Sequence, residues 1–241
     1  LGETFGSVDF GLDSFGANDI AVDYNTGTSG DSAVRIMLHS DSLENHRDHY
    51  DGTRLGFNPT IKIKMNESTT LDLSYEHADH ERYIDRGVPT ENGEPVERFE
   101  KITFGGDDNL TTLKANILRA TLSKVFSDTR KGNLSIVSSD FEKMYKNYYA
   151  SGYTAGATVV TMDGYLDPTE RENTIISGNI VNEVGNHTLL VGVELIDTTN
   201  ENFRYNTFWS TTSDDNEVFN ITRPMDFSVN SCLLYTSDAA D

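Results

Sequence analysis

The sequence contains 241 residues, 39 acidic and 19 basic, with a formal net charge of −20. This charge argues against a nucleic-acid partner, because phosphate binding needs a basic surface. No stretch approaches the ~18 apolar residues of a transmembrane helix, which excludes a helical membrane protein but leaves open a membrane β-barrel, whose strands are apolar on one face only.

Both ends of the sequence differ from the ends that are usual in a complete natural protein. There is no initiating Met and no basic, apolar leader, so we expect the chain to begin inside a longer protein. Residues 231–241 resemble the translation of a transposase-type sequencing adapter, and we interpret them as a non-native tail; a natural tail with an odd cysteine is the alternative. Cys232 is the only cysteine, so no disulfide framework or Cys-based metal site is expected.

The first 65 residues alternate between apolar and polar side chains. Alternation predicts β-strands with one apolar face over residues 4–12, 18–25, 32–42 and 54–65. The last of these is the clearest, because Leu55, Phe57, Ile61 and Ile63 share one parity. Its length exceeds the ~5–6 residues of a typical globular strand and matches the ~9–11 residues of a membrane-spanning strand.

A fifth strand begins at Thr69, where Leu71, Leu73 and Tyr75 share one face. A charged, turn-rich stretch follows from Ala78 to Asp108. A loop of about thirty residues is far longer than a usual connection, so it is either functional or disordered.

The remaining strands are predicted over residues 111–126, 132–148, 173–183 and 187–198, with a tenth beginning near Glu217. The apolar parity of the first of these changes midway, which predicts a β-bulge near Leu118. Residues 150–171 and 199–216 are interpreted as two more long loops.

Connection lengths alternate between short and long from the second strand onward. This pattern predicts an all-β, antiparallel up-and-down meander of about ten long strands with long loops at one end, as in an outer-membrane barrel. The apolar parity would face lipid, and the polar parity would line a wet interior. Aromatic residues near strand ends, including Tyr145 and Tyr148, would form interfacial girdles.

Several motifs resemble the TonB-dependent siderophore receptors. They are Arg47-Asp48-His49-Tyr50, Leu71-Asp72-Leu73-Ser74-Tyr75-Glu76, Asp85-Arg86-Gly87-Val88-Pro89 and Phe104-Gly105-Gly106-Asp107-Asp108-Asn109, with weaker support from Gly164-Tyr165-Leu166-Asp167 and residues 187–194. The resemblance implies that residues 1–230 are a segment of a 22-stranded transmembrane β-barrel in the outer membrane of a Gram-negative bacterium.

The same resemblance implies a function and partners. Such receptors import ferric siderophores with energy from TonB, which acts through an N-terminal plug domain that this sequence lacks. The implied partners are a ferric siderophore or similar chelate, outer-membrane lipid and TonB.

Five residues are candidates for ligand binding. Arg86 and Arg98, with Tyr83, could contact an anionic chelate, because Arg supplies forked hydrogen-bond donors. Tyr205 and Trp209 could stack on aromatic groups of the ligand. The alternatives are ion pairs with the loop's many acids for the arginines, and girdle or packing roles for the aromatic residues.

No catalytic, cofactor or metal site is expected. His77, Asp79, His80 and Glu81 suggest metal ligands at first sight, but they are interpreted as a solvated strand end, as His46 and His49 are as loop residues. A receptor that binds the chelate needs no protein ligand to iron. No nucleophile–base pair, phosphate loop or paired-carboxylate arrangement has a supporting context, so the chain is not expected to be an enzyme.

Two other functions remain open from the residues alone. A passive porin-like channel would share the alternation and loop pattern, and an upstream plug domain would exclude it. A soluble acidic β-sandwich or adhesin would fit the mean hydropathy of −0.48, but it would bury residues such as Leu55 and Phe57 beneath a second sheet. As an isolated barrel segment the chain should aggregate in the absence of detergent.

Overall fold

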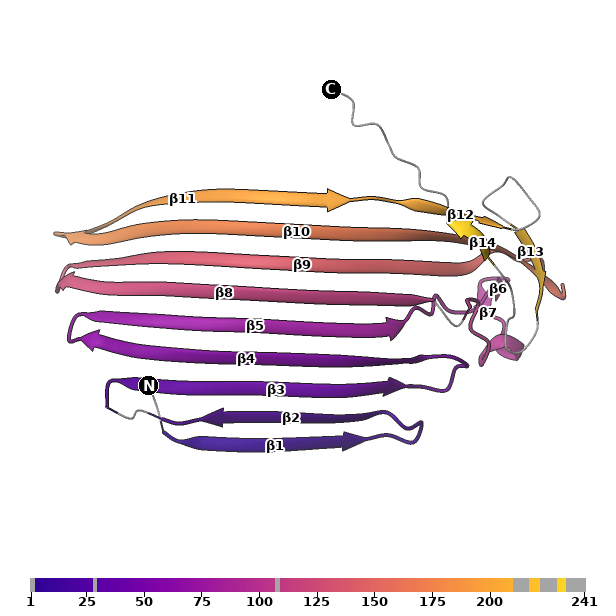
Figure 1. Cartoon of the computed structure of the whole chain (residues 1–241), viewed down its shortest axis with the longest axis horizontal. Coiled ribbons are helices and arrows are strands. Elements are labelled where there is room, and N and C mark those ends of the chain that lie inside the picture. Colours follow the sequence, from indigo (N-terminus) through magenta and orange to yellow (C-terminus); the bar gives the residue numbers. More distant parts are fainter. Residues whose placement is uncertain (1–2, 28–29, 107–108, 210–216, 222–228, 233–241) are drawn as a thin grey trace, which may run out of the picture.

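The chain folds into one large, curved antiparallel sheet (Figure 1). The computed structural model describes residues 3–27, 30–106, 109–209, 217–221 and 229–232, with the backbone alone at 207–209, 217 and 229–232. The long strands follow each other in chain order across the sheet. They are β1 (Phe5–Leu12), β2 (Asn18–Asn25), β3 (Ser32–Glu44), β4 (Asp51–Asn66), β5 (Thr69–Tyr83), β8 (Leu110–Ser127), β9 (Arg130–Gly152), β10 (Val159–Val184) and β11 (His187–Asn202).

Short elements occur only near one end of these strands in the described part of the chain. β6 (Thr90–Glu91) and β7 (Glu94–Pro95) form a small hairpin, followed by the 3₁₀ helix η1 (Glu97–Phe99). β12 (Tyr205–Trp209) and β13 (Glu217–Asn220) both pair with β10, as β11 does, and β14 (Val229–Cys232) pairs with β12. The tenth strand predicted from Glu217 is therefore a further segment along the same edge of β10, not a new neighbour of β11.

The two ends of the sheet differ. At the turn end, two-residue connections join β4 to β5, β8 to β9 and β10 to β11. At the loop end lie residues 45–50, 84–109 and 153–158. Of the long loops predicted from composition, only residues 84–109 form one in the described chain. Residues 159–184 are a single strand, and β11 and β12 occupy most of 199–209.

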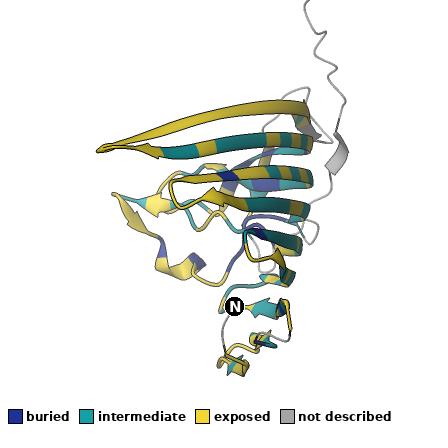
Figure 2. Ribbon diagram, turned by 90° about the vertical axis from the view of Figure 1, so that its left-hand side faces the viewer, coloured by how far each residue is buried: buried dark blue, intermediate teal, exposed yellow. Residues whose placement is uncertain are grey.

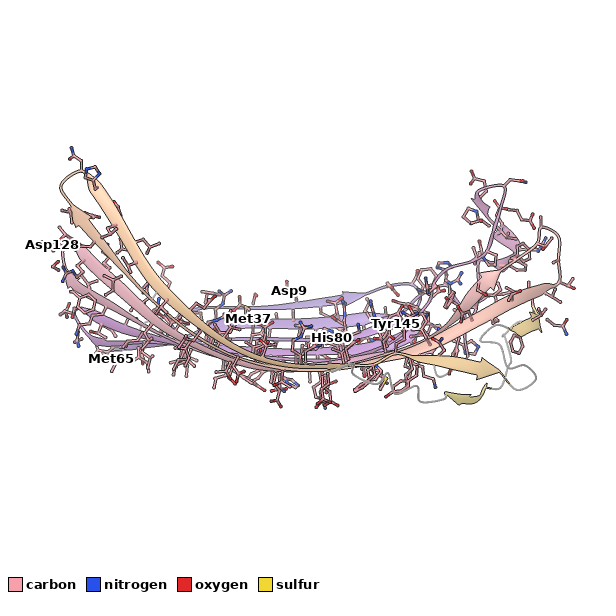
Figure 3. The ribbon with its side chains drawn as sticks, turned by 90° about the horizontal axis from the view of Figure 1, so that it is seen from above. Asp9, Met37, Met65, His80, Asp128 and Tyr145 are labelled. Carbon is pink, nitrogen blue, oxygen red and sulfur yellow. The ribbon has the colours of Figure 1, made fainter. Side chains whose placement is uncertain are left out.

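The register of the strands confirms the two-faced pattern. Leu38 pairs with Phe57, and Ile61 pairs with Leu73, so the apolar residues of neighbouring strands share one face. Figure 3 shows the sheet bent into a trough and labels residues of the other parity, including Asp9 and His80, on the concave side. The apolar parity therefore forms the convex face, and the polar parity forms the concave face.

Ion pairs across neighbouring strands fill the concave face. Arg35 Nη2 lies 2.6 Å from Asp23 Oδ2, and Lys62 Nζ lies 3.0 Å from Asp72 Oδ1. Arg54 Nε lies 2.8 Å from Asp41 Oδ2 on the next strand. Opposite charges directly across a strand pair favour one register over slipped alternatives.

The bulge predicted near Leu118 is wrong. Pairing of β8 with both neighbours runs without interruption through this position, and the only irregularity with β9 lies between Val125 and Ser127. Leu118 therefore lies on the convex face, whereas Ile117 lies on the concave face opposite Glu76 and Ser139. The change of parity reflects apolar residues on both faces of one regular strand.

No second layer covers the convex face in the described part of the chain (Figure 2). Leu55 is 41% exposed, and exposed large apolar residues occur on every long strand except β5. The buried residues gather instead at the loop end, around residues 84–109. This arrangement differs from that of a sandwich, in which the apolar face is the core. Within the described residues, no helix is long and apolar enough to cross a membrane.

Candidate ligand-binding site at the loop end

The long loop, residues 84–109, has its own hydrophobic core. Phe99 packs edge-on against Phe104, with ring centroids 5.7 Å apart. The loop residues of this core meet the ends of β9 and β10 at Tyr148, Val160 and Met162, each 2% exposed or less. A loop with this much buried apolar surface holds a defined shape, so the alternative of a disordered loop is wrong for its described residues.

Arg47 joins two of the motifs that carried the family resemblance. Its guanidinium forms an ion pair with Asp85, and both side chains are about nine-tenths buried. The same guanidinium donates to the backbone oxygens of Glu100 (2.9 Å) and Ile102. Arg47 lies in the loop after β3, and Asp85 follows β5, so this charged pair fixes the two loops to each other.

Asn109 closes the loop onto β9. Its side chain is 1% exposed. Its Nδ2 donates to the Ile84 and Tyr148 carbonyls (2.6 and 3.2 Å), and its Oδ1 accepts from the Tyr148 N–H (2.6 Å). The Asn109 side-chain amide therefore supplies hydrogen-bond partners to backbone N–H and C=O groups where β9 extends beyond the end of β8.

A second polar cluster attaches the β6–β7 hairpin to the loop between β9 and β10. Glu91 Oε1 accepts from Tyr153 Oη–H and Gly156 N–H, each at 2.9 Å, and lies 3.4 Å from Arg98 Nη2. Arg98 also donates to Tyr153 Oη. The Gly156 N–H, the Tyr153 hydroxyl and Arg98 lower the pKa of Glu91 below its usual 4.5. Desolvation and the bond to Glu91 raise the pKa of Tyr153.

Beside this scaffold, two arginines and three tyrosines form a continuous cluster, which we call the Arg–Tyr cluster: Arg86, Tyr145, Tyr149, Tyr165 and Arg204. The Arg86 guanidinium lies 4.2 Å above the Tyr149 ring, and that of Arg204 lies 3.7 Å above Tyr165. The Tyr165 ring lies 6.2 Å from Tyr149 and 5.9 Å from Tyr145. Cations over aromatic faces gain electrostatic stabilisation and pre-orient their donors.

The strand register puts the three tyrosines of the cluster on the concave parity. Tyr145 pairs with Asp167 and Tyr149 pairs with Asp163, so both tyrosines share a face with Tyr165. Figure 3 labels Tyr145 on the concave side near the loop end. The Tyr149 hydroxyl donates to Asp163 Oδ2 at 2.6 Å, which fixes the position of its ring.

A pocket of about 350 Å³ opens next to Arg86 and Tyr149. Its other walls are residues 87–89, Phe104, Ala150 and Ser151. An open pocket with a guanidinium and a phenol ring at its wall suits a ligand that is anionic and flat.

The structure distributes the five predicted candidates among different environments. Arg86 lies in the Arg–Tyr cluster. Tyr83 is 2% exposed, and Arg98 is engaged with Glu91 and Tyr153. Tyr205 pairs with Leu166, on the face opposite to Tyr165. The side chain of Trp209 lies outside the described residues.

Sequence reasoning missed four members of the cluster. Tyr165 was assigned to a loop, and Tyr145 to a girdle facing lipid, whereas β9 and β10 continue past these positions with alternating side chains. The related prediction for Tyr148 is also wrong, because Tyr148 is buried under the long loop. The signal was present in the sequence as Tyr145 and Tyr149 four residues apart, facing the alternating Asp163, Tyr165 and Asp167.

Among the described residues, no group of three or more His, Cys, Asp or Glu side chains is arranged to hold a metal ion. His77 and Asp79 lie on the face opposite to His80, because β5 continues as a strand to Tyr83. The prediction that the loop starts at Ala78 is therefore wrong by six residues.

An up-and-down antiparallel sheet with a bare apolar convex face, an ionic concave face and one end carrying the loops has the fold of a segment of a transmembrane β-barrel. Several solved structures with the same fold are siderophore receptors. The ferric-catecholate import receptor Fiu from E. coli K12 matches with a TM-score of 0.69 and 15% identity over 88% of this chain and 35% of its own. The ferripyoverdine receptor of the outer membrane of Pseudomonas aeruginosa matches with a TM-score of 0.70 and 12% identity over 90% and 30%.

BauA, the ferric preacinetobactin receptor of Acinetobacter baumannii, matches with a TM-score of 0.72 and 13% identity over 95% of this chain and 36% of its own. The chain thus spans about a third of the length of these receptors. No family model matches the sequence, and no curated protein matches it. The resemblance to siderophore receptors read from the motifs is confirmed at the level of fold.

Proposed function

We propose that the chain is part of an outer-membrane active-transport receptor that imports a ferric siderophore or similar chelate with TonB-derived energy. The Arg–Tyr cluster carries this proposal. It lies at the loop end, where the long extracellular loops of such barrels are found, and its tyrosines line the concave side. Its two guanidiniums and three phenol rings match a ligand that combines negative charge with planar aromatic groups.

The dimensions of the apolar band support an outer-membrane location. On β4 the apolar parity runs from Leu55 to Met65. At ~3.4 Å per residue this stretch covers about 34 Å along the strand, or ~25 Å across the membrane at a tilt of ~45°. An apolar band of about 25 Å is typical of an outer-membrane barrel. The solved receptors with this fold are importers rather than enzymes, which supports a transport function.

The test uses the complete receptor, encoded by the gene from which this chain comes, expressed in a bacterial strain that lacks its own siderophore receptors. Iron-limited growth and uptake of radiolabelled iron are measured with a ferric catecholate and a ferric hydroxamate as probes. We expect growth on at least one of the two chelates and loss of uptake when the proton gradient across the inner membrane is collapsed. Uptake that continues without this gradient would indicate a passive channel instead.

Substitution tests the proposed binding site in the same strain. Arg86→Ala and Arg204→Ala should each weaken chelate binding about tenfold, because each removes a charge-assisted contact. Arg130→Ala, at the turn end, removes an equal charge and serves as the control. Equal affinity in all three variants would contradict the assignment of the Arg–Tyr cluster to the ligand.

A further inference from the structure

A groove of about 450 Å³ runs along the convex face near the turn end. It crosses β8, β9, β10 and β11, and most of the side chains that line it are apolar. The lining residues are Leu122, Lys124, Phe126, Gly132, Asn133, Leu134, Gly178, Asn179, Ile180, Val191, Gly192 and Val193.

Two glycines on neighbouring strands hollow out this surface. Gly132 pairs with Ile180, and Gly178 pairs with Leu134, so the two glycines are close neighbours on the convex parity. A Cβ on Gly132 would come within 3.0 Å of the Asn179 carbonyl and 3.1 Å of the Phe126 ring. At Gly178 a Cβ would meet its neighbours at 3.6 Å or more. Gly178 can therefore accept a larger side chain, which would fill the groove.

Lys124 is the cation in the groove wall. It lies near the turn, and Phe126, another lining residue, lies between it and the end of β8. Lys124 precedes the last residue of β8, Ser127, by three positions, and its side chain is exposed. Its Nζ lies 5.5 Å from the centroid of the Phe126 ring. Convex residues farther from the turn, such as Leu122 and Leu134, are apolar. A long Lys side chain at the border of an apolar band reaches toward the headgroup level of a membrane.

We propose that this groove binds a single phospholipid of the periplasmic leaflet, with an acyl chain along the apolar floor and the phosphate on Lys124. The groove combines the two chemistries that a phospholipid needs: Lys124, whose long side chain can reach the headgroup level, and an apolar channel that leads away from it toward the membrane centre. The inference rests on the proposed outer-membrane location, and it adds one defined lipid site to the otherwise uniform apolar band.

The test uses the complete receptor purified from outer membranes, stripped of lipid in detergent and then incubated with phosphatidylglycerol. Native mass spectrometry counts the lipids retained per receptor. We expect one retained lipid in the unsubstituted protein and about a tenfold lower retention in Lys124→Gln, because a charge-assisted contact is lost. Gly178→Leu should lower retention similarly by filling the groove.

Two matched controls isolate the groove. Lys131→Gln removes a cation at nearly the same height but on the concave parity, and Ala120→Leu adds bulk to the convex face outside the groove. Both should retain lipid as the unsubstituted receptor does. Equal retention in all the proteins, or an equal fall in Lys131→Gln, would overturn the proposal.

Three further outcomes are informative: the first tests the identity of the lipid, and the other two separate this inference from the proposed function. If lipopolysaccharide but no phospholipid copurifies with the receptor and competes with phosphatidylglycerol, the assigned lipid is wrong. If the receptor reaches the outer membrane and imports iron but retains no specific lipid, only this inference fails. If the receptor sediments with a fraction other than the outer membrane, the proposed function fails first.

Discussion

The turn-end and loop-end halves of the convex face are built from the same continuous strands, but the turn-end half has apolar side chains and the loop-end half has polar ones. Ile176 and Glu172 lie on the same face of β10, four residues apart, and both are exposed. The same change occurs between Tyr75 and His77 on β5, and between Leu195 and Asp197 on β11. On these strands the convex face therefore changes from apolar to polar at a boundary, as expected where strands leave the lipid and project into water. On β4 the apolar residues continue farther, to Phe57 and Leu55, which pair with His77 and Asp79.

The two halves also differ in what stabilises them. In the turn-end half, the convex side chains have no protein layer over them in the described chain, so lipid is the solvent that we expect to cover them. In the loop-end half, the protein supplies a core of its own, built by residues 84–109 on the ends of β9 and β10. Each half should respond to a different kind of substitution.

A charge placed on each side of the boundary should separate the two halves most strongly. Ile180→Arg puts a cation in the middle of the apolar band of β10, which runs from Ile176 to Val184 on this face, and should destabilise the folded complete receptor by about 2–4 kcal/mol. Glu172→Arg, on the same strand and face, should change stability by less than about 1 kcal/mol. Denaturant unfolding of the receptor in lipid vesicles measures both values. Equal costs for the two variants would mean that the boundary is not a membrane surface.

The buried amide of the loop-end half gives the next largest effect. Asn109→Ala leaves the Tyr148 N–H and the Ile84 carbonyl without their side-chain partner and should cost about 1–3 kcal/mol locally. Faster hydrogen exchange and proteolysis of residues 84–109 would report this loss, while β4 and β5 near the turn end stay protected. Asn109→Asp keeps the acceptor for the Tyr148 N–H but puts a buried carboxyl oxygen against the Ile84 and Tyr148 carbonyls, so it should cost at least as much as Asn109→Ala. Loosening of the turn-end strands would show that the halves are not independent.

The sequence predicts the turn-end half well, since lipid on one face and water on the other impose strict alternation. The first three strands and their turns follow directly from positions such as Val8, Phe10 and Ile36. The loop-end half has no such constraint. Strands that face water on both sides have the composition of a loop. For this reason the sequence predicts a loop over residues 159–171, which are part of β10.

The candidate site is only partly predictable for the same reason. Arg86 stands out because it lies in a motif within a long loop. Tyr149, Tyr165 and Arg204 come together only because β9, β10 and the segment before β12 lie side by side. The strand pairing of this half cannot be read from its sequence, because apolar alternation, the usual guide to register, is missing there. Arg98 has the same chemistry as Arg86 in the sequence, and only the fold shows that Glu91 and Tyr153 engage it.

The smallest expected effect is a pH dependence confined to the loop-end half. The pKa of Glu91 is lowered in the folded protein, so its bonds to Gly156, Tyr153 and Arg98 contribute fully above its unfolded value of about 4.5. The contribution is lost as the pH falls through the lowered pKa, because a protonated carboxyl no longer attracts Arg98. Protection of residues 84–109 from hydrogen exchange, after correction for the pH dependence of the intrinsic exchange rate, should therefore fall below about pH 4 relative to pH 6. In Glu91→Gln, residues 84–109 should be less protected from hydrogen exchange at pH 6 than in the unsubstituted protein. This variant should also lack the part of the pH response that Glu91 causes. A response that persists unchanged in Glu91→Gln would assign it to another acid.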